Sequence, residues 1–198
     1  MINLAKAEES RPYEIFKKLY DEAHKNKQVN IEACCISSFN SDLNKVSSRF
    51  VNIKYIKGSK FYFFSNYSSS KAKDFMTHKQ ISCIFFWPAI SSQIRINAEI
   101  FRATSDESDE HFGNRSLEKN ALAISSRQSE KIQAYSHVEK NFLEILENGN
   151  LSQRPKYWGG YYFIPDSFEF WRGHKSRLNK RELFTKENNG WSKSILQP

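Results

Sequence analysis

Two arginines near the C-terminus, Arg177 and Arg181, have the residue type and spacing that most clearly indicate chemistry. Residues 178–185 are predicted to form a strand, and residues four apart in a strand point to the same face of a sheet. Asn179 would lie between the two guanidinium groups on that face. Because converging guanidinium groups bind anions through charge-assisted hydrogen bonds, we expect an anion site there.

A second candidate anion site is a run of hydroxyl residues, Ser68 to Ser70, that opens a short predicted helix and is followed by Lys71 and Lys73. The first turn of a helix offers free N–H groups and the positive end of the helix dipole, which suits a phosphate. Serines at a helix start are also common as ordinary N-caps. This pattern alone leaves both interpretations open.

Three further polar residues, His111, Arg115 and Lys119, recur every four positions. They would share one face if a single helix ran through them. Gly113 and Asn114 instead predict a break between two short helices. The spacing by itself therefore favours an ordinary solvated basic face over a binding site.

The elements that would position these residues form a β-rich chain with a few helices. Apolar periodicity predicts helices over residues 12–25 and 136–148. Strands are expected at residues 31–39, 46–56, 60–65, 81–87, 91–103, 161–163, 168–171 and 178–185. Pro165, Asp166 and Ser167 read as a turn between two of these strands. Residues 1–10 are expected to be a flexible segment.

Composition agrees with a single domain over residues 1–198, a length that can bury a core without disulfides. The formal charge of +8 is spread along the chain, which implies anionic ligands without selecting nucleic acid over small phosphates. Cys34, Cys35 and Cys83 lie in apolar runs and lack the spacing of a metal site, so we expect free thiols of a reducing cytoplasm. No stretch has the length of a membrane span or a signal peptide. A cytoplasmic protein is expected.

The last part of the chain carries a series of motifs at fixed spacings. It reads W-G-G-Y from Trp158, P-x-x-x-E-F-W from Pro165, R-L-x-x-R from Arg177 and W-x-x-x-x-L-x-P from Trp191. This series resembles the C-terminal signature of the pyridoxamine 5'-phosphate oxidase family. Aromatic residues that only fill a β core would not explain the two arginines or the order of the motifs. The resemblance extends upstream and covers residues 12–198.

In that family the fold is an FMN-binding split β-barrel, and the flavin lies across the interface of a homodimer. The resemblance therefore implies a chain that is mainly β with peripheral helices, FMN as cofactor and a homodimer. Upstream motifs agree: R-x-V-x-x-K from Arg49, aromatic-S-N from Phe64, S-x-K-A from Ser69, Q-I-R from Gln93 and S-x-Q-S from Ser126. The family often has arginine where Ser70 stands.

The resemblance implies FMN contacts at Arg49, Phe50, Val51, Lys54, Phe64, Ser65, Ser70, Lys71, Gln93, Gln128, Ser129, Trp171 and Arg181. We expect the flavin phosphate to bind at Arg49, Ser65, Lys71 and Arg181, because charge converges there. At the predicted dimer interface, Phe85, Phe86 and Trp87 are candidates for burial. Filling of the core is an equally good interpretation of these three residues.

Substrate contacts are implied at Lys54, His111, Arg115, Lys119, Arg177 and Asn179, of which Arg177 and Asn179 would flank the reacting ring as the catalytic pair. The family has Tyr, Ser and His where this chain has His111, Lys119 and Asn179. An amide cannot exchange a proton as an imidazole does, so a different substrate stays open.

The sequence thus predicts an FMN-dependent oxidase that converts pyridoxamine or pyridoxine 5'-phosphate to pyridoxal 5'-phosphate with oxygen as acceptor. Its expected partners are a small phosphorylated or anionic substrate, oxygen and a second copy of the chain, with no nucleic acid and no membrane. One alternative is an oxidase of another substrate, since the S-R-Q-S-E run and L-Q-P end resemble flavin oxidases of phenazine biosynthesis. Another is a flavin-binding protein without turnover.

Overall fold

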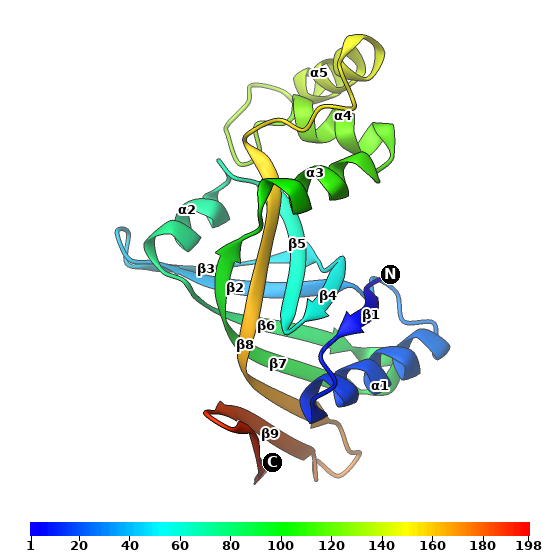
Figure 1. The fold of residues 1–198 in the computed structure, drawn as a ribbon, viewed down its shortest axis with the longest axis vertical. Coiled ribbons are helices and arrows are strands. Elements are labelled where there is room, and N and C mark those ends of the chain that lie inside the picture. The colour runs from blue at the N-terminus through cyan, green and yellow to red at the C-terminus, as the bar shows by residue number, and fades with distance from the viewer.

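One long strand, β8 (Trp158–Arg172), is the axis of the fold. Along one edge it pairs with β7 (Ser92–Arg102). Its other edge pairs first with β5 (Lys60–Asn66) and then with β9 (Lys180–Glu187). In the computed structural model, which describes residues 1–198, β8 runs down the middle of the molecule (Figure 1). It therefore joins the two ends of the fold.

The other strands extend the sheet on both sides of this axis in the order β1-β4-β5-β8-β7-β6-β2-β3, with β10 next to β9. They are β1 (Asn3–Ala7), β2 (Ala33–Asn40), β3 (Lys45–Asn52), β4 (Tyr55–Gly58), β6 (Gln80–Trp87) and β10 (Gly190–Leu196). All neighbours are antiparallel except β1 and β4. The prediction of a mainly β chain with peripheral helices is confirmed.

Helix α1 (Arg11–Lys25) covers one face of the sheet with an apolar side that the sequence periodicity predicted. Its buried Phe16 packs edge-on against Phe61, Phe85 and Trp87 at centroid distances of 5.4, 5.2 and 5.6 Å. Phe85 and Trp87 are thus core residues, whereas Phe86 between them is 58% exposed. Only Phe86 of the three stays a candidate for an interface.

Helices α3, α4 and α5 stand beyond the sheet at the end away from α1, and α2 flanks the sheet (Figure 1), whereas the short η1 contacts α1. They are η1 (Pro88–Ile90, a short 3-10 turn), α2 (Ser70–Thr77), α3 (Ser105–Gly113), α4 (Leu117–Ser125) and α5 (Tyr135–Asn148). Helix α5 buries no residue completely, because α4 is its principal packing partner. None of the helices is both long and apolar enough to cross a membrane. All three cysteines are free thiols.

The first residues differ from the expected flexible segment. Strand β1 pairs with β4 in parallel, and Ile2 is buried with its backbone N–H donating to the Tyr20 hydroxyl at 2.8 Å. The pairing partner lies about fifty residues away in the sequence, so the short polar stretch gives no local signal of it.

The expected turn at residues 165–167 is instead a bulge inside β8. Pro165 pairs with Ala98 and Ser167 with Asn97, which leaves Asp166 as the extra residue. Proline lacks an N–H and is found inside strands chiefly at bulges or edges. The Pro-Asp-Ser signal therefore marks a kink in one strand rather than a boundary between two.

The strand expected at residues 46–56 is also divided, into β3 and β4, because the chain turns away at Ile53 and Lys54. The Ile53 N–H donates to the Glu32 carbonyl and the Lys54 N–H to the Tyr62 carbonyl. This break carries Lys54 out of β3 and towards the helices.

Candidate functional site

A pocket of about 260 Å³ lies where β5 ends against α4 and the loop that follows it. Its lining combines predicted cofactor residues with predicted substrate residues. The predicted residues are Phe64, Ser65, Arg115, Lys119 and Gln128, and they lie beside Trp158, which was not predicted. The structure thus brings together residues from three separate parts of the chain that the motifs had assigned to one site.

Lys71, at the start of α2, lies behind one wall of this pocket. Its ammonium donates to Ser65 Oγ (3.0 Å), Ser69 Oγ (3.2 Å) and Gln128 Oε1 (2.8 Å). Burial, together with the nearby charge of Arg49, lowers the pKa of Lys71 to about 8. All three acceptors are neutral, so this buried charge has no acidic partner.

Ser70 and Ser129 complete this group, since their hydroxyls are hydrogen-bonded to each other at 3.2 Å. The contact ties the start of α2 to the loop after α4. Ser65, Ser70, Lys71, Gln128 and Ser129 are therefore neighbours, as their predicted common role requires.

Arg49, on β3, lies on the same side as Lys71 but its charge is already paired. Its guanidinium contacts Asp74 Oδ2 at 3.0 Å and also donates to Ser38 and Ser47. Burial alone would raise the pKa of Asp74, but hydrogen bonds from Asn40, Ser38, Ser47 and Arg49 bring it below its usual value. Sequence reasoning missed Asp74, whose only signal was an acidic residue within a basic helix.

The neighbours of Arg49 on β3 do not join this group equally. Phe50 points to the opposite face of the sheet and is 73% exposed, while Val51 packs against the core. Alternate residues of a strand face opposite sides, so Arg49 and Phe50 cannot contact the same ligand through their side chains.

His111, at the end of α3, stacks on Phe64 with centroids 3.6 Å apart and rings inclined by 16°. The Tyr55 hydroxyl is 2.6 Å from its Nδ1 atom. Burial lowers the pKa of His111 to about 4, and the positive charges of Arg115, Lys54, Lys119 and Lys57 contribute. His111 is therefore neutral at physiological pH. Tyr55 is a further residue of this site that sequence reasoning missed.

Arg115 lies in the turn between α3 and α4, where the predicted helix break occurs. Its guanidinium carbon is 4.4 Å from the centre of the Trp158 ring, and Nη2 donates to the Lys119 carbonyl at 3.0 Å. Its Nη1 atom is buried and has no hydrogen-bond partner. Buried donors are nearly always paired in folded proteins, so this atom indicates a missing acceptor.

Lys54, His111, Arg115 and Lys119 form one cluster despite the break between the helices. Burial lowers the pKa of Lys54, and the nearby charges of Lys119 and Arg115 also lower it, against the opposing effect of Glu32 at 4.0 Å. No acidic side chain lies within ion-pair distance of Arg115 or Lys119. The arrangement can hold a small anion.

The remaining predicted residues lie at the other end of the sheet. Gln93 on β7, Trp171 on β8 and Arg181 on β9 are neighbours in register. Arg181 Nε donates to Glu169 Oε1 at 2.8 Å, and Arg95 Nη1 donates to Glu169 Oε2 at 3.0 Å. Both arginines of this end share one carboxylate.

The predicted shared strand face of Arg177, Asn179 and Arg181 is wrong. Strand β9 begins only at Lys180, and Arg177 is an exposed turn residue with φ of +60°. The Asn179 side-chain oxygen accepts the His174 N–H at 3.0 Å, which closes this turn. Asn179, Trp171 and Arg181 do line one pocket of about 800 Å³, which Arg177 does not reach.

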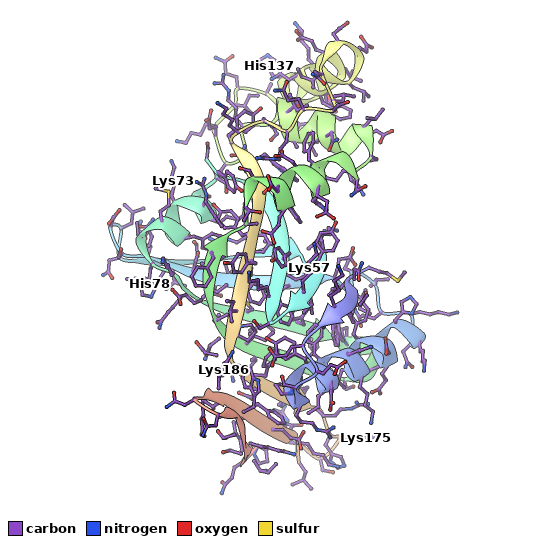
Figure 2. All side chains as sticks on the ribbon, viewed as in Figure 1. Lys57, Lys73, His78, His137, Lys175 and Lys186 are labelled. Atoms are coloured by element: carbon purple, nitrogen blue, oxygen red, sulfur yellow. The ribbon has the colours of Figure 1, made fainter.

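Within one protomer the two groups are far apart. Gly159 of β8 pairs with Ser65, whereas Trp171 of the same strand pairs with Arg181. The backbone between Gly159 and Trp171 is about 40 Å long at the rise of a strand, ~3.3 Å per residue. Lys73 on α2 lies beside the upper part of the sheet, whereas Lys175 in the turn before β9 lies near the lower end of the molecule (Figure 2). The two groups therefore lie towards opposite ends of β8.

Two glycines of the W-G-G-Y motif bring β8 close to α3. A Cβ atom on Gly159 would lie 2.3 Å from the Tyr67 hydroxyl, and one on Gly160 would lie 2.7 Å from Ala103 Cβ. Gly160 N–H also donates to Ser108 Oγ at 3.0 Å. The motif therefore holds α3, and with it His111, against the sheet.

Family models match most of the chain. Residues 20–148 match the model described as pyridoxamine 5'-phosphate oxidase, and residues 158–198 match the pyridoxine 5'-phosphate oxidase C-terminal dimerisation region. A pyridoxine/pyridoxamine 5'-phosphate oxidase of Leptospira biflexa is 34% identical over 189 residues, covering 94% of this chain and 89% of the relative. One of Paraburkholderia phytofirmans is 37% identical over 155 residues, covering 77% and 73%.

Solved structures resemble the fold. PhzG of Burkholderia lata, in complex with tetrahydrophenazine-1-carboxylic acid, superposes with a TM-score of 0.90 at 24% identity, covering 96% of this chain and 93% of that one. A pyridoxamine 5'-phosphate oxidase-related, FMN binding protein of Nostoc punctiforme gives a TM-score of 0.76 at 11% identity, covering 95% and 98%. The predicted split-barrel fold is confirmed.

Proposed function

The chain belongs to the pyridoxamine 5'-phosphate oxidase family, and from this premise we propose that it is an FMN-dependent oxidase of pyridoxamine or pyridoxine 5'-phosphate. Pyridoxal 5'-phosphate would be the product and oxygen the acceptor. The observation that carries the proposal is the buried, unpartnered Nη1 of Arg115 beside Lys119, in a pocket whose wall is bonded to Lys71. Unpaired cations at two adjacent places suit two phosphates, one of the cofactor and one of the substrate.

The donors around Lys71 fit the phosphate of FMN. Lys71, Ser65, Ser70 and Ser129 offer one cation and three hydroxyls without a carboxylate to repel the ligand. When bound, FMN supplies a ring that accepts a hydride from the substrate and passes the electrons to oxygen. Gln128 lies beside Ser65 and has a side-chain amide that can bind a polar ring edge.

The protein's own residues would orient the substrate rather than make or break its bonds. Arg115 and Lys119 line one pocket, Lys54 is close enough for their charges to lower its pKa, and the three would fix the substrate phosphate by charge. The aromatic stack of Phe64, His111 and Trp158 forms the apolar side of the same cluster. Holding the reacting carbon in place lowers the entropic part of the barrier.

A homodimer follows from the division of the predicted cofactor residues. Because Gln93, Trp171 and Arg181 lie about 40 Å along β8 from Ser65 within one protomer, we infer that a second copy supplies them to each site. The exposed Phe50 and Phe86 on the outer face of the sheet are apolar surface that such a partner would cover.

Subunit complementation tests the shared site. Lys71→Ala and Arg181→Ala proteins are purified separately, mixed under mild unfolding and refolded, and flavin binding is titrated. In a mixed dimer with shared sites, one of the two sites combines the intact Lys71 with the intact Arg181. Random reassociation makes about half of the dimers mixed, so wild-type flavin affinity should return to about a quarter of all sites. If each site lay within a single protomer, every site would carry one of the two substitutions, and wild-type flavin affinity would not return at any site.

The oxidase reaction is tested by adding pyridoxamine and pyridoxine 5'-phosphates to the flavin-loaded protein and measuring peroxide and pyridoxal 5'-phosphate. Release of both products supports the proposal. One observation favours a second candidate, an oxidase of a different anionic substrate: the Asn179 amide closes a turn instead of standing free beside a ring. Bound flavin without turnover of either vitamer phosphate would favour that candidate or a binding protein.

A further inference from the structure

Tyr55 and His111 form a close pair that no motif of the sequence indicated. Tyr55 begins β4, directly after Lys54, and its hydroxyl lies 2.6 Å from His111 Nδ1. The two rings are nearly perpendicular, at 87°, while Phe64 stacks on the face of the imidazole. The bond to Tyr55 and the stacking on Phe64 together hold the imidazole ring in one orientation.

The direction of this hydrogen bond decides which tautomer the imidazole adopts. Nδ1 of His111 is the one partner of the Tyr55 hydroxyl in the structure, so a phenol that accepted from Nδ1–H would leave its own proton unpaired. When the hydroxyl donates, Nδ1 is the acceptor and the proton of a neutral imidazole resides on Nε2. Burial raises the pKa of Tyr55, with a contribution from Glu110, which keeps the phenol protonated as a donor.

The charges that face His111 are mainly positive. Lys54 approaches from the turn before β4, Lys57 from β4, Arg115 from the turn after α3, and Lys119 from α4. Glu110, on α3 itself, is 3.9 Å from Lys57. Phe64 and Trp158 from the sheet add no charge. A proton on His111 would add a further positive charge to this cluster, which is unfavourable until an anion is bound.

We propose that Tyr55 is a positioning residue: its hydroxyl fixes His111 as the neutral Nε2–H tautomer, which donates a hydrogen bond to the anion held by Lys54, Arg115 and Lys119. The inference rests on the proposed function, in which this cluster holds the anionic group of the substrate. The proposal also explains how a histidine can serve at position 111. The family resemblance places a tyrosine at position 111, and a hydroxyl is likewise an uncharged donor. The pair supplies that kind of donor from a histidine.

The test uses the full-length protein with and without FMN, inorganic phosphate as the probe, and long-range ¹H–¹⁵N spectra of labelled histidine. In the wild type we expect an unprotonated Nδ1 and a protonated Nε2 at pH 7, and a shift of the Nε2 signal when phosphate is added. Tyr55→Phe should mix the tautomers and weaken phosphate about fivefold, the effect of one ordinary hydrogen bond. Tyr157→Phe, which removes a hydroxyl bonded to the Ile124 carbonyl, is the matched control and should change neither.

A second background separates positioning from a general structural effect. His111→Tyr supplies its own neutral donor, so adding Tyr55→Phe to it should leave phosphate affinity unchanged. Protonated Nδ1 in the wild type would overturn the proposal, as would a His111 signal indifferent to phosphate or an equal effect of Tyr55→Phe in both backgrounds. The tautomer is read without flavin or turnover. The tautomer of His111 can therefore be determined even if the protein lacks the proposed oxidase activity.

Discussion

Cations at the two ends of β8 have opposite surroundings. At the helix end, Lys71 and Arg115 contact hydroxyls, a side-chain amide, a carbonyl and an aromatic ring, and Lys119 has no acidic partner. At the C-terminal end, Arg95 and Arg181 share the Glu169 carboxylate. Lys71, Arg115 and Lys119 thus have no acidic side chain within ion-pair distance, although Arg49 and Lys54 nearby do, whereas Arg95 and Arg181 are paired.

This difference teaches which cations await a ligand. A partly buried cation without a counterion costs free energy that a bound anion can recover, whereas a paired cation is already satisfied. The helix end is therefore the principal anion site. The Arg181 guanidinium is held by bonds to Glu169 and to the Gln197 carbonyl, so a ligand would contact only its remaining N–H groups.

The largest expected effect comes from the unpaired arginine. Arg115→Ala should weaken pyridoxamine phosphate binding about 30-fold, since one charge-assisted contact is worth roughly 1.5–3 kcal/mol. Thermal stability should fall modestly, because the variant loses the bond from Nη2 to the Lys119 carbonyl and the contact with Trp158, although Nη1 has no partner to lose. Arg11→Ala, an exposed arginine on α1, is the control. If the Arg115 variant bound pyridoxamine phosphate as tightly as this control, the unpaired cations of the helix end would not be the anion site.

The carboxylate of the C-terminal end should show the reverse pattern. Glu169→Gln keeps the shape of the side chain but removes the charge that Arg95 and Arg181 share, so we expect a loss in Tm of about 5 °C, as for other moderately destabilising changes. Phosphate binding at the helix end should stay intact. Calorimetry beside a phosphate titration makes the comparison, and an unchanged Tm would show that the pairing contributes nothing.

Lys71 gives a pH-dependent effect. Its charge is lost as pH rises through about 8, so flavin affinity should fall between pH 7 and pH 9. Lys71→Met should weaken flavin about tenfold at pH 7 and abolish this dependence. Without flavin the sign is opposite: between about 8 and 10.5 the unfolded chain binds more protons, so stability rises with pH in the wild type. If the Lys71 variant kept the pH dependence of flavin affinity or of stability, that dependence would have to come from another titrating group.

The smallest expected effect is at Asn179. Asn179→His restores a residue that can exchange a proton, and peroxide release with pyridoxamine phosphate should rise about threefold while flavin binding is unchanged. The gain is limited because the variant loses the bond that closes the turn at His174. No activity in either form, with flavin bound, would count against the proposed substrate.

Sequence reasoning found the parts of the molecule whose signals are local. Periodicity located α1, and the family resemblance of short motifs assigned Ser65, Lys71 and Gln128 to one group, in which the structure shows them hydrogen-bonded. It failed where a distant partner decides the outcome. The Asp74 contact with Arg49 and the Tyr55 contact with His111 depend on side chains from elements remote in sequence.

Local signals also misled where one pattern has two structural meanings. Pro165 can mark a turn or a bulge, and only the pairing of Ala98 and Asn97 with β8 distinguishes them. The arginine spacing at residues 177–181 looked like a strand face, but a turn closed by Asn179 occupies the first part of it. Such choices are made by tertiary pairing, which no short window of sequence contains.

The central position of β8 has a consequence for how the chain folds. The strand pairs with β5 and β7, yet it is made only after both of them and after α3, α4 and α5. During synthesis, β5 and β7 therefore each present an unpaired edge until residues 158–172 emerge. Such edges pair readily with other chains, and contacts between residues far apart in sequence form slowly. The nascent protein is therefore most prone to aggregate just before residues 158–172 emerge.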